Sequence, residues 1–158
     1  MIFVLHGRRY AAPSFHWLTD RFKISLEKAR LGAALMDWLV FGAYLTRRGV
    51  SSGCGENEAL RDNLLNSFFD MMYAALRNAG MKELEFFEFE EGMRQRFTQY
   101  DSVMAEANDP LRCAASALST NIFGETVEAA KFSMAAFFYS ADTLLAIRDF
   151  FYESKIVN

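Results

Sequence analysis

Apolar residues recur at alternating steps of three and four residues through several long stretches of this sequence. This spacing places the apolar side chains on one face of an α-helix. A helix with one apolar face needs another element to cover it, so several such helices favour a bundle. With 158 residues, the chain has the usual length of one domain. We therefore expect an all-α fold, namely a single-domain helical bundle of five or six helices over residues 1–158.

Turn-forming residues predict the boundaries of the first two long helices. The first helix begins near Leu31 and is expected to end at Arg47-Arg48-Gly49, because glycine readily takes the left-handed conformation after a last turn. Residues 50–57, rich in glycine and serine, are then expected to form a loop. The second helix is expected to end at Gly80. Its predicted apolar face consists of Leu60, Leu64, Phe68, Met71 and Ala75.

Three further helices are predicted after Gly80. The first of them carries an apolar face from Phe86 to Met104. Asp109-Pro110 predicts the start of a short helix that ends at Gly124, because Asp caps helix N-termini and Pro is tolerated at the first helical position. The last helix, from about residue 126 to 152, is apolar on two sides. It is expected to be central, or to be shared with a partner.

Residues 1–26 are less regular than the helical core predicted for residues 27–152. Met1 to Leu5 is a short apolar run that could pair as a strand. Ser14 is expected to cap a short helix that runs through Phe22.

The charges are unevenly distributed along the chain. The first 50 residues hold 8 Lys or Arg against 3 Asp or Glu, and the remaining residues hold 9 against 17. Either the basic end is guided to an acidic surface, such as lipid headgroups or a ribosome, or the two halves attract one another within the domain.

No apolar run reaches the ~18 residues that span a bilayer, and the first residues lack the order of a secretory signal. We therefore expect a soluble protein.

Catalytic and cofactor motifs are missing from the sequence. His6 and His16 belong to no HExxH or ExxH arrangement, and Cys54 and Cys113 form no CxxC. No GxSxG, GxxxxGK[ST] or GxGxxG occurs. The arginines belong to no recognised nucleic-acid-binding motif. We therefore expect a non-enzymatic protein with reduced thiols, no cofactor, no metal and no nucleic-acid partner.

Asp37 is the one charge inside the apolar span AALMDWLVFG. On a helix it shares a face with Val40 and Tyr44. Two interpretations are open. Asp37 is either a partly buried acid with an Arg or Tyr partner, or it lies at a helix edge with access to water. A small-ligand pocket near Asp37, Tyr44 and Tyr100 is a further hypothesis.

Sixteen phenylalanines, several of them in doublets, supply more apolar surface than a simple bundle core requires. Either the core is thick and some rings are exposed, or part of this surface binds a protein or a second copy. The candidate partner-binding residues are Phe97, Tyr100, Asp101, Phe137, Phe138 and Tyr139.

Two segments carry a resemblance to a known family. Residues 68–81, FFDMMYAALRNAGM, are similar to a helix that reads roughly FFxDMDxALRExGV in the ubiquinol-cytochrome c chaperone family. Residues 97–124 then follow that family's order of FYxxLxxYDxxL, an Asp-rich break and ALxRNxxG, and a final helix follows in both. Thr98 replaces an aromatic residue of the pattern, and Asp37 falls about where the family carries a His.

The resemblance implies an assembly factor. Mitochondrial relatives look after newly made cytochrome b, together with a small partner protein and near the ribosomal exit tunnel, before the subunit enters the cytochrome bc1 complex. Such a protein binds an apolar client without chemistry, and its aromatic and Met side chains supply adaptable contact area. Peripheral contact with the inner membrane or the ribosome is also implied. The alternative is a homodimeric structural or regulatory module that uses the helix at 126–152.

Overall fold

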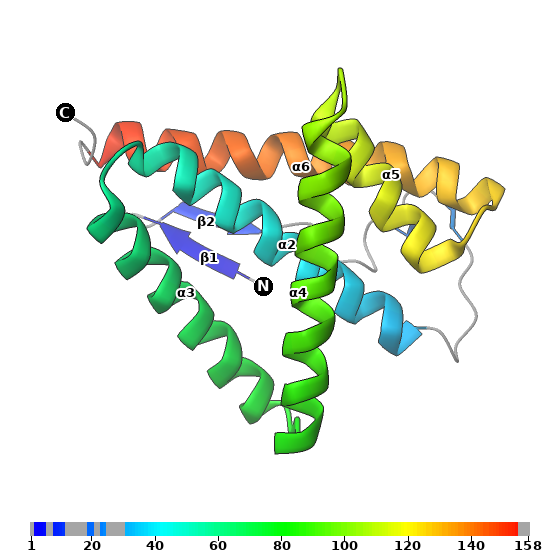
Figure 1. Ribbon diagram of the computed structural model, residues 1–158, viewed down its shortest axis with the longest axis horizontal. Helices are drawn as coiled ribbons and strands as arrows, with labels where there is room; N and C mark the ends of the chain where they lie inside the picture. The colour runs from blue at the N-terminus through cyan, green and yellow to red at the C-terminus, as the bar shows by residue number, and fades with distance from the viewer. Residues whose placement is uncertain (1, 6–7, 12–18, 21–22, 25–30, 155–158) are drawn as a thin grey trace.

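A computed structural model describes residues 2–5, 8–11, 19–20, 23–24 and 31–154 (Figure 1). Within these residues, five long helices make up the bundle, which confirms the predicted all-α fold. They are α2 (Leu31–Cys54), α3 (Glu58–Asn78), α4 (Glu83–Ala105), α5 (Pro110–Phe123) and α6 (Val127–Glu153).

A short antiparallel hairpin precedes the bundle. Strand β1 (Ile2–Leu5) pairs with β2 (Arg8–Ala11), with Ile2 opposite Ala11 and Leu5 opposite Arg8. The apolar run at the N-terminus therefore pairs as a strand. Of the short helix predicted after Ser14, most residues lie outside the described part of the chain.

The predicted end of the first helix at Gly49 is wrong. Helix α2 continues through the predicted loop to Cys54, and Gly55, with a φ of 53°, makes the turn instead. Gly49 and Gly53 lie inside the helix, where α6 approaches closely. A Cβ atom on Gly49 would lie 2.8 Å from the Ile147 side chain, and one on Gly53 would overlap the ring of Phe151. Both glycines therefore serve helix packing, not helix termination.

The other predicted boundaries agree with the structure. Asp109 caps α5 by accepting a hydrogen bond from the Arg112 backbone N–H at 3.3 Å. Gly124, with a φ of 68°, ends that helix, and Thr126 caps α6 by accepting from the backbone N–H of Ala129 at 3.3 Å. Each of these boundaries depends on a local residue preference, which is why the sequence predicts them.

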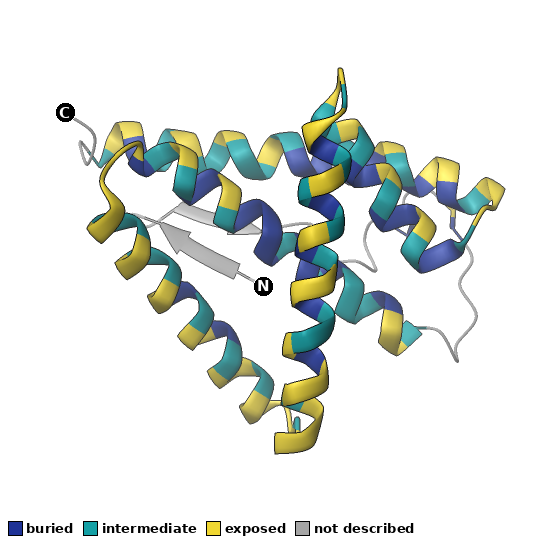
Figure 2. Cartoon of the chain, in the orientation of Figure 1, coloured by how far each residue is buried: buried dark blue, intermediate teal, exposed yellow. Residues whose placement is uncertain are grey.

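The helices form a layered bundle with one projecting arm. Helices α2 and α5 both pack against α6, and α4 crosses α2 steeply while it packs against α5 (Figure 1). Helix α3 leaves the end of α2 and meets α4 in a V (Figure 1). The buried residues gather where α2, α4, α5 and α6 meet, and the arm formed by α3 is largely exposed (Figure 2).

The predicted apolar face of α3 is only partly correct. Phe68 is buried as predicted, but Met71 is 65% exposed and Ala75 is also exposed, whereas Met72 is buried. The inward side of α3 is therefore rotated by about 100° from the predicted line over this turn. The reason is that α3 packs against the rest of the described chain along one side only, so apolar side chains on its other side, such as Met71, stay exposed.

Candidate functional site

Asp101 joins α4 to α2 through several side chains. The Tyr44 hydroxyl donates a hydrogen bond to Asp101 Oδ1 at 2.9 Å, and Arg47 donates to Oδ2 at 3.0 Å. Arg48 adds a longer ion pair to Oδ1 at 3.6 Å. The Arg47 guanidinium also lies 5.2 Å from the centre of the Phe97 ring, within the range of a cation–π contact. The carboxylate of Asp101 therefore fixes the position of α4 on the second half of α2.

Tyr44 is fully buried in this arrangement. Burial, followed by the hydrogen bond and the negative charge of Asp101, raises the pKa of Tyr44 to about 12. The phenol is therefore neutral at physiological pH. It acts as a hydrogen-bond donor that lies close to both Asp101 and the Met104 sulfur.

A second polar network joins α2, α4 and α5. It lies closer to the N-terminal ends of α2 and α4 than the network around Asp101 does. Arg96 on α4 pairs with Asp37 on α2 through Nε and Oδ1 at 2.9 Å. Gln99 connects this pair to α5, because its Oε1 accepts a hydrogen bond from Arg96 at 3.4 Å and one from the Asn121 amide at 3.0 Å. The Asp37 side chain is 17% exposed. Of the two interpretations of Asp37, the structure therefore has the partly buried acid with an arginine partner.

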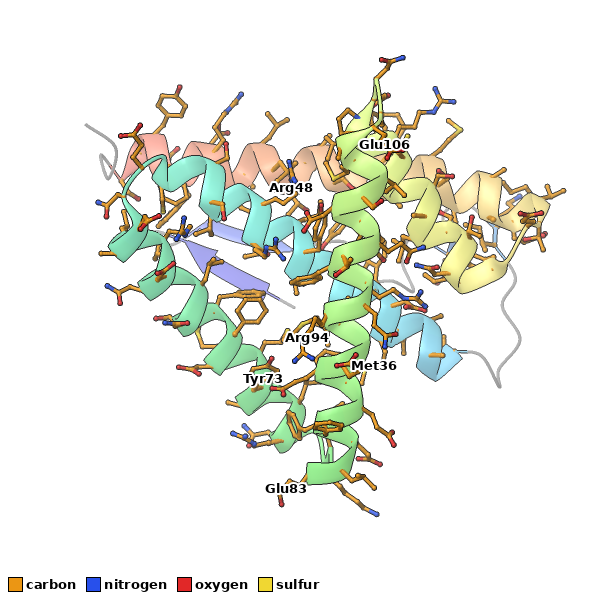
Figure 3. The ribbon with its side chains drawn as sticks, in the orientation of Figure 1. Met36, Arg48, Tyr73, Glu83, Arg94 and Glu106 are labelled. Carbon is orange, nitrogen blue, oxygen red and sulfur yellow. The ribbon has the colours of Figure 1, made fainter. Side chains whose placement is uncertain are left out.

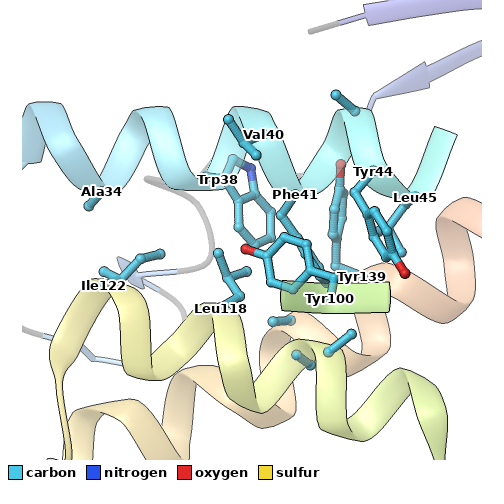
Figure 4. Close-up of a cluster of buried hydrophobic side chains, with 14 of the residues drawn as sticks. Ala34, Trp38, Val40, Phe41, Tyr44, Leu45, Tyr100, Leu118, Ile122 and Tyr139 are labelled. Carbon is cyan, nitrogen blue, oxygen red and sulfur yellow. The ribbon is translucent and has the colours of Figure 1, made fainter. Parts of the chain in front are cut away.

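Tyr100 lies between the two networks and has 0% exposure. Its ring packs against Phe41 and Tyr44, with ring centres 5.3 Å and 5.0 Å away (Figure 4). Its hydroxyl meets no partner at hydrogen-bond distance and angle among the described residues, although the Asn121 side chain lies near enough to lower its pKa. Burial, and then the charge of Asp37, raise the pKa of this phenol well above its ordinary value. Tyr100 is therefore a packing residue in its neutral form.

The aromatic core continues from Tyr100 toward α6. Trp38 packs against Tyr139 with ring centres 4.5 Å apart and meets Phe132 edge-on at 5.6 Å. Gly42 gives room for the Tyr139 hydroxyl, which would lie 3.3 Å from a Cβ atom at that position. In Figure 4, Trp38 and Phe41 point from α2 toward the other helices and lie near Tyr139 of α6 in the centre of the bundle.

The six candidate partner-binding residues fall into two groups. Phe97, Tyr100 and Tyr139 are buried in the core, so no partner reaches them in this structure. Phe138 is exposed, Phe137 is half-buried, and the Asp101 carboxylate is partly accessible while it holds α2. Of the predicted partner-binding residues, only Phe137 and Phe138 on α6 and the ion-paired Asp101 are therefore accessible.

A groove of about 840 Å³ opens between α2, α4 and the turn from α3 to α4. Met36 forms part of its wall beside α4 (Figure 3). The ion pair of Asp37 and Arg96 closes one side, and Glu85 and Glu88 line the α4 rim. Its apolar lining consists of Met36, Val40, Leu76, Met81, Phe89 and Met93. The groove is therefore rich in methionine and acidic at its edge.

Gly92 opens the groove on its α4 side. Among the described residues, no neighbouring atom lies within 4 Å of the place where a Cβ atom would be. Glycine in the middle of an exposed helix costs roughly 0.5–1 kcal/mol relative to alanine. Gly92 therefore leaves open space on the α4 side of the groove that a larger side chain would enter.

The arrangement supplies binding surface and structural ion pairs. Within the described residues, no group of three His, Cys, Asp or Glu side chains lies close enough to hold a metal ion. None of the described helices has the length and apolar character needed to cross a membrane. The candidate site is the groove between α2, α4 and the α3–α4 turn, with its apolar lining and acidic edge. Comparisons with protein-family models, with curated proteins and with solved structures found no match.

Of the three residues expected near a pocket, Asp37 lines the groove, whereas Tyr44 and Tyr100 are buried in the core. Sequence reasoning did not identify which side chains pair with Asp37 and Asp101. Arg96 lies 59 residues from Asp37, and Tyr44 lies 57 residues from Asp101. No short motif links such positions. One feature of the sequence points weakly to the groove. Gly92 lies among good helix formers in the middle of α4, where a glycine often marks a place with a packing or binding role.

Proposed function

We propose that this chain is a non-enzymatic assembly factor that holds an apolar client segment on its helical surface. The groove between α2, α4 and the α3–α4 turn is the binding site in this proposal. Two half-buried methionines in its lining, Met36 and Met81, support it, because thioether side chains adapt to apolar surfaces of different shape.

The acidic rim favours a particular kind of client. Glu85 and Glu88 lie on the same side of α4 as Gly92, and all three line the groove. Segments of membrane proteins are apolar in the middle and carry Lys or Arg at the cytoplasmic end. Such a segment would place its apolar part on the methionines and its basic flank against the two glutamates. The groove chemistry thus fits a newly made membrane subunit.

The resemblance to the ubiquinol-cytochrome c chaperone family suggests which subunit this is. In this proposal the client is cytochrome b or another subunit of the cytochrome bc1 complex, and the compartment is the bacterial cytoplasm or the mitochondrial matrix. A small partner protein and peripheral contact with the inner membrane or the ribosome belong to the same proposal.

A blocked groove tests client binding directly. In Gly92→Phe the new ring occupies the open space in the groove, and Gly92→Ala is the matched control. The probe is a synthetic apolar peptide with two lysines at one end, labelled for fluorescence anisotropy. We expect Gly92→Phe to weaken peptide binding at least about tenfold, a loss of about 1.4 kcal/mol. Gly92→Ala should bind nearly as the wild type does. Equal binding by both variants and the wild type would rule out the groove.

The acidic rim is tested separately by charge reversal. Glu88→Lys changes the charge at the groove, whereas Glu106→Lys makes the same change at the exposed C-cap of α4. Only Glu88→Lys should weaken binding of the lysine-flanked peptide, and a peptide with glutamate flanks should bind Glu88→Lys better. The client itself is tested by deleting the gene and measuring assembled cytochrome bc1, where an unchanged level counts decisively against the proposal.

A further inference from the structure

The outward face of α6 carries a line of exposed apolar side chains. These side chains are between 45% and 78% exposed. They are separated by seven, four, seven and seven residues, which keeps them within about 20° of one line along a helix of 3.6 residues per turn. The buried residues of α6 lie on the opposite side of the helix. The exposed residues are Val127, Met134, Phe138, Leu145 and Tyr152. We call them the α6 line.

Four of the five residues of the α6 line lie symmetrically about the midpoint between Tyr139 and Ser140. Each of these four has another member at the same distance on the other side of that midpoint, whereas the counterpart of Phe138 is Ala141, which is not in the line. An interface with twofold symmetry requires this property, because residue i of one copy meets residue j of the other and j meets i. The matched positions are 127 with 152, 134 with 145, and 138 with 141.

We propose that α6 pairs with α6 of a second copy, antiparallel about a twofold axis at this midpoint. Side-chain sizes fit this register. Near the centre, the large Phe138 ring faces the partner's Ala141, so a large residue meets a small one. Further out, Met134 faces the partner's Leu145, and at each end Val127 faces the partner's Tyr152. The line covers about 38 Å of helix, at 1.5 Å per residue, so the occupant must be long and straight. A second α6 has that length and that spacing.

The charges beside the line agree with the same register. Lys131 and Asp149 lie on the same flank of the α6 line, each about 40° from it. The twofold axis keeps that flank on one side of the interface, so Lys131 faces the partner's Asp149, and the contact occurs twice. Asp149 already pairs with Arg148 of its own chain at 2.9 Å at the surface. The added lysine would extend that pair into a small network.

Two grooves lie on the other flank of the line. One, of about 830 Å³, runs between α5 and the N-terminal half of α6 and includes Ala130 and Phe137 in its lining. The other, of about 960 Å³, runs between α2 and the C-terminal half of α6 and includes Tyr152. In the antiparallel pair, the first groove of each copy faces the second groove of the other. The most exposed member of the line, Tyr152, then lies against the entrance of the partner's first groove.

Matched variants test the pairing by sedimentation and light scattering at micromolar concentrations. Met134→Asp places a charge in the α6 line, and Met71→Asp places one on α3, where Met71 is equally exposed. We expect dimers for the wild type and Met71→Asp. We expect Met134→Asp to be monomeric, with an unchanged helical circular dichroism spectrum. A monomeric wild type, or a dimeric Met134→Asp, would overturn the proposal. A monomer that instead binds lipid vesicles through this face would overturn it too.

Charge exchange and crosslinking test the register. Lys131→Glu should weaken dimerisation by about two- to thirtyfold, the range for two exposed ion pairs. Adding Asp149→Lys to that variant should restore it. In a Cys113→Ser background, Met134→Cys with Leu145→Cys should form disulfide-linked dimers on oxidation, and Met134→Cys alone should not. Crosslinking by Met134→Cys alone would mean a parallel pair and would overturn the antiparallel register. These outcomes do not depend on the client groove, which lies between α2 and α4.

Discussion

The ring centres of Tyr44 and Tyr100 lie 5.0 Å apart in the same core, yet their hydroxyl groups differ in hydrogen bonding. Both side chains have 0% exposure. The Tyr44 hydroxyl donates a hydrogen bond to Asp101 at 2.9 Å, whereas the Tyr100 hydroxyl has no partner among the described residues. The two tyrosines therefore form a natural comparison within one core.

Removing each hydroxyl should have a different effect on stability. Tyr44→Phe deletes a hydrogen bond to a charged group, so we expect it to lower the free energy of unfolding by about 1.5–3 kcal/mol. Tyr100→Phe deletes a buried polar atom without a partner, so it should be neutral or stabilising by up to about 1 kcal/mol. Urea denaturation measures both changes. A Tyr100→Phe variant as unstable as Tyr44→Phe would contradict the assignment of these hydroxyl groups.

Alkaline pH should destabilise the protein through the same residues. The pKa of Tyr44 is raised from its ordinary 10.0 to about 12, and that of Tyr100 is raised as well. The unfolded chain therefore releases these protons at lower pH than the folded protein. Their contribution to stability is complete below about pH 10 and decreases as the pH rises from 10 toward 12. Urea denaturation over this range measures the loss, which should be smaller in Tyr44→Phe.

Alanine should act in opposite directions at different glycines. Gly49→Ala and Gly53→Ala place a Cβ atom against the side chains of Ile147 and Phe151, so we expect each to cost about 1–3 kcal/mol. Gly32→Ala and Gly92→Ala meet no atom of the described part of the chain within 4 Å and should stabilise by about 0.5–1 kcal/mol. Thermal denaturation gives the sign directly. Stabilisation at Gly53 would mean that α2 and α6 are further apart than the structure has them.

The ion pair of Asp37 and Arg96 should contribute more than an exposed pair on the same helix. The Asp37 and Arg96 side chains are 17% and 35% exposed, and those of Glu91 and Arg94 are 45% and 72% exposed. A double-mutant cycle with alanine should give a coupling energy of about 1–2 kcal/mol for the first pair and at most about 0.5 kcal/mol for the second. Equal couplings would show that solvent screens both pairs alike.

Local preferences in the sequence predicted much of the fold. Asp109-Pro110, Gly80 and Gly124 mark helix boundaries wherever they occur, because capping and left-handed glycine involve only neighbouring residues. The same reasoning was wrong at Gly49. A glycine within a helix and a glycine after its end look alike in sequence, and only the closeness of Ile147 distinguishes them here.

The candidate site could be predicted only in part for a similar reason. Periodicity placed Phe97 and Tyr100 on the apolar face of their helix, but it could not say whether the core or a partner covers that face. The structure buries both. It leaves Phe138 exposed, on the side of α6 opposite the buried face.

The sequence by itself thus determined the helices, most of their ends and which side chains are apolar, because those properties depend on residues within a few turns of each other. Only the tertiary structure decided which apolar faces are covered, which arginine meets Asp37 and where a groove opens beside Gly92. Those contacts join residues far apart in the chain. Their geometry is set by how whole helices cross, and no local spacing encodes that.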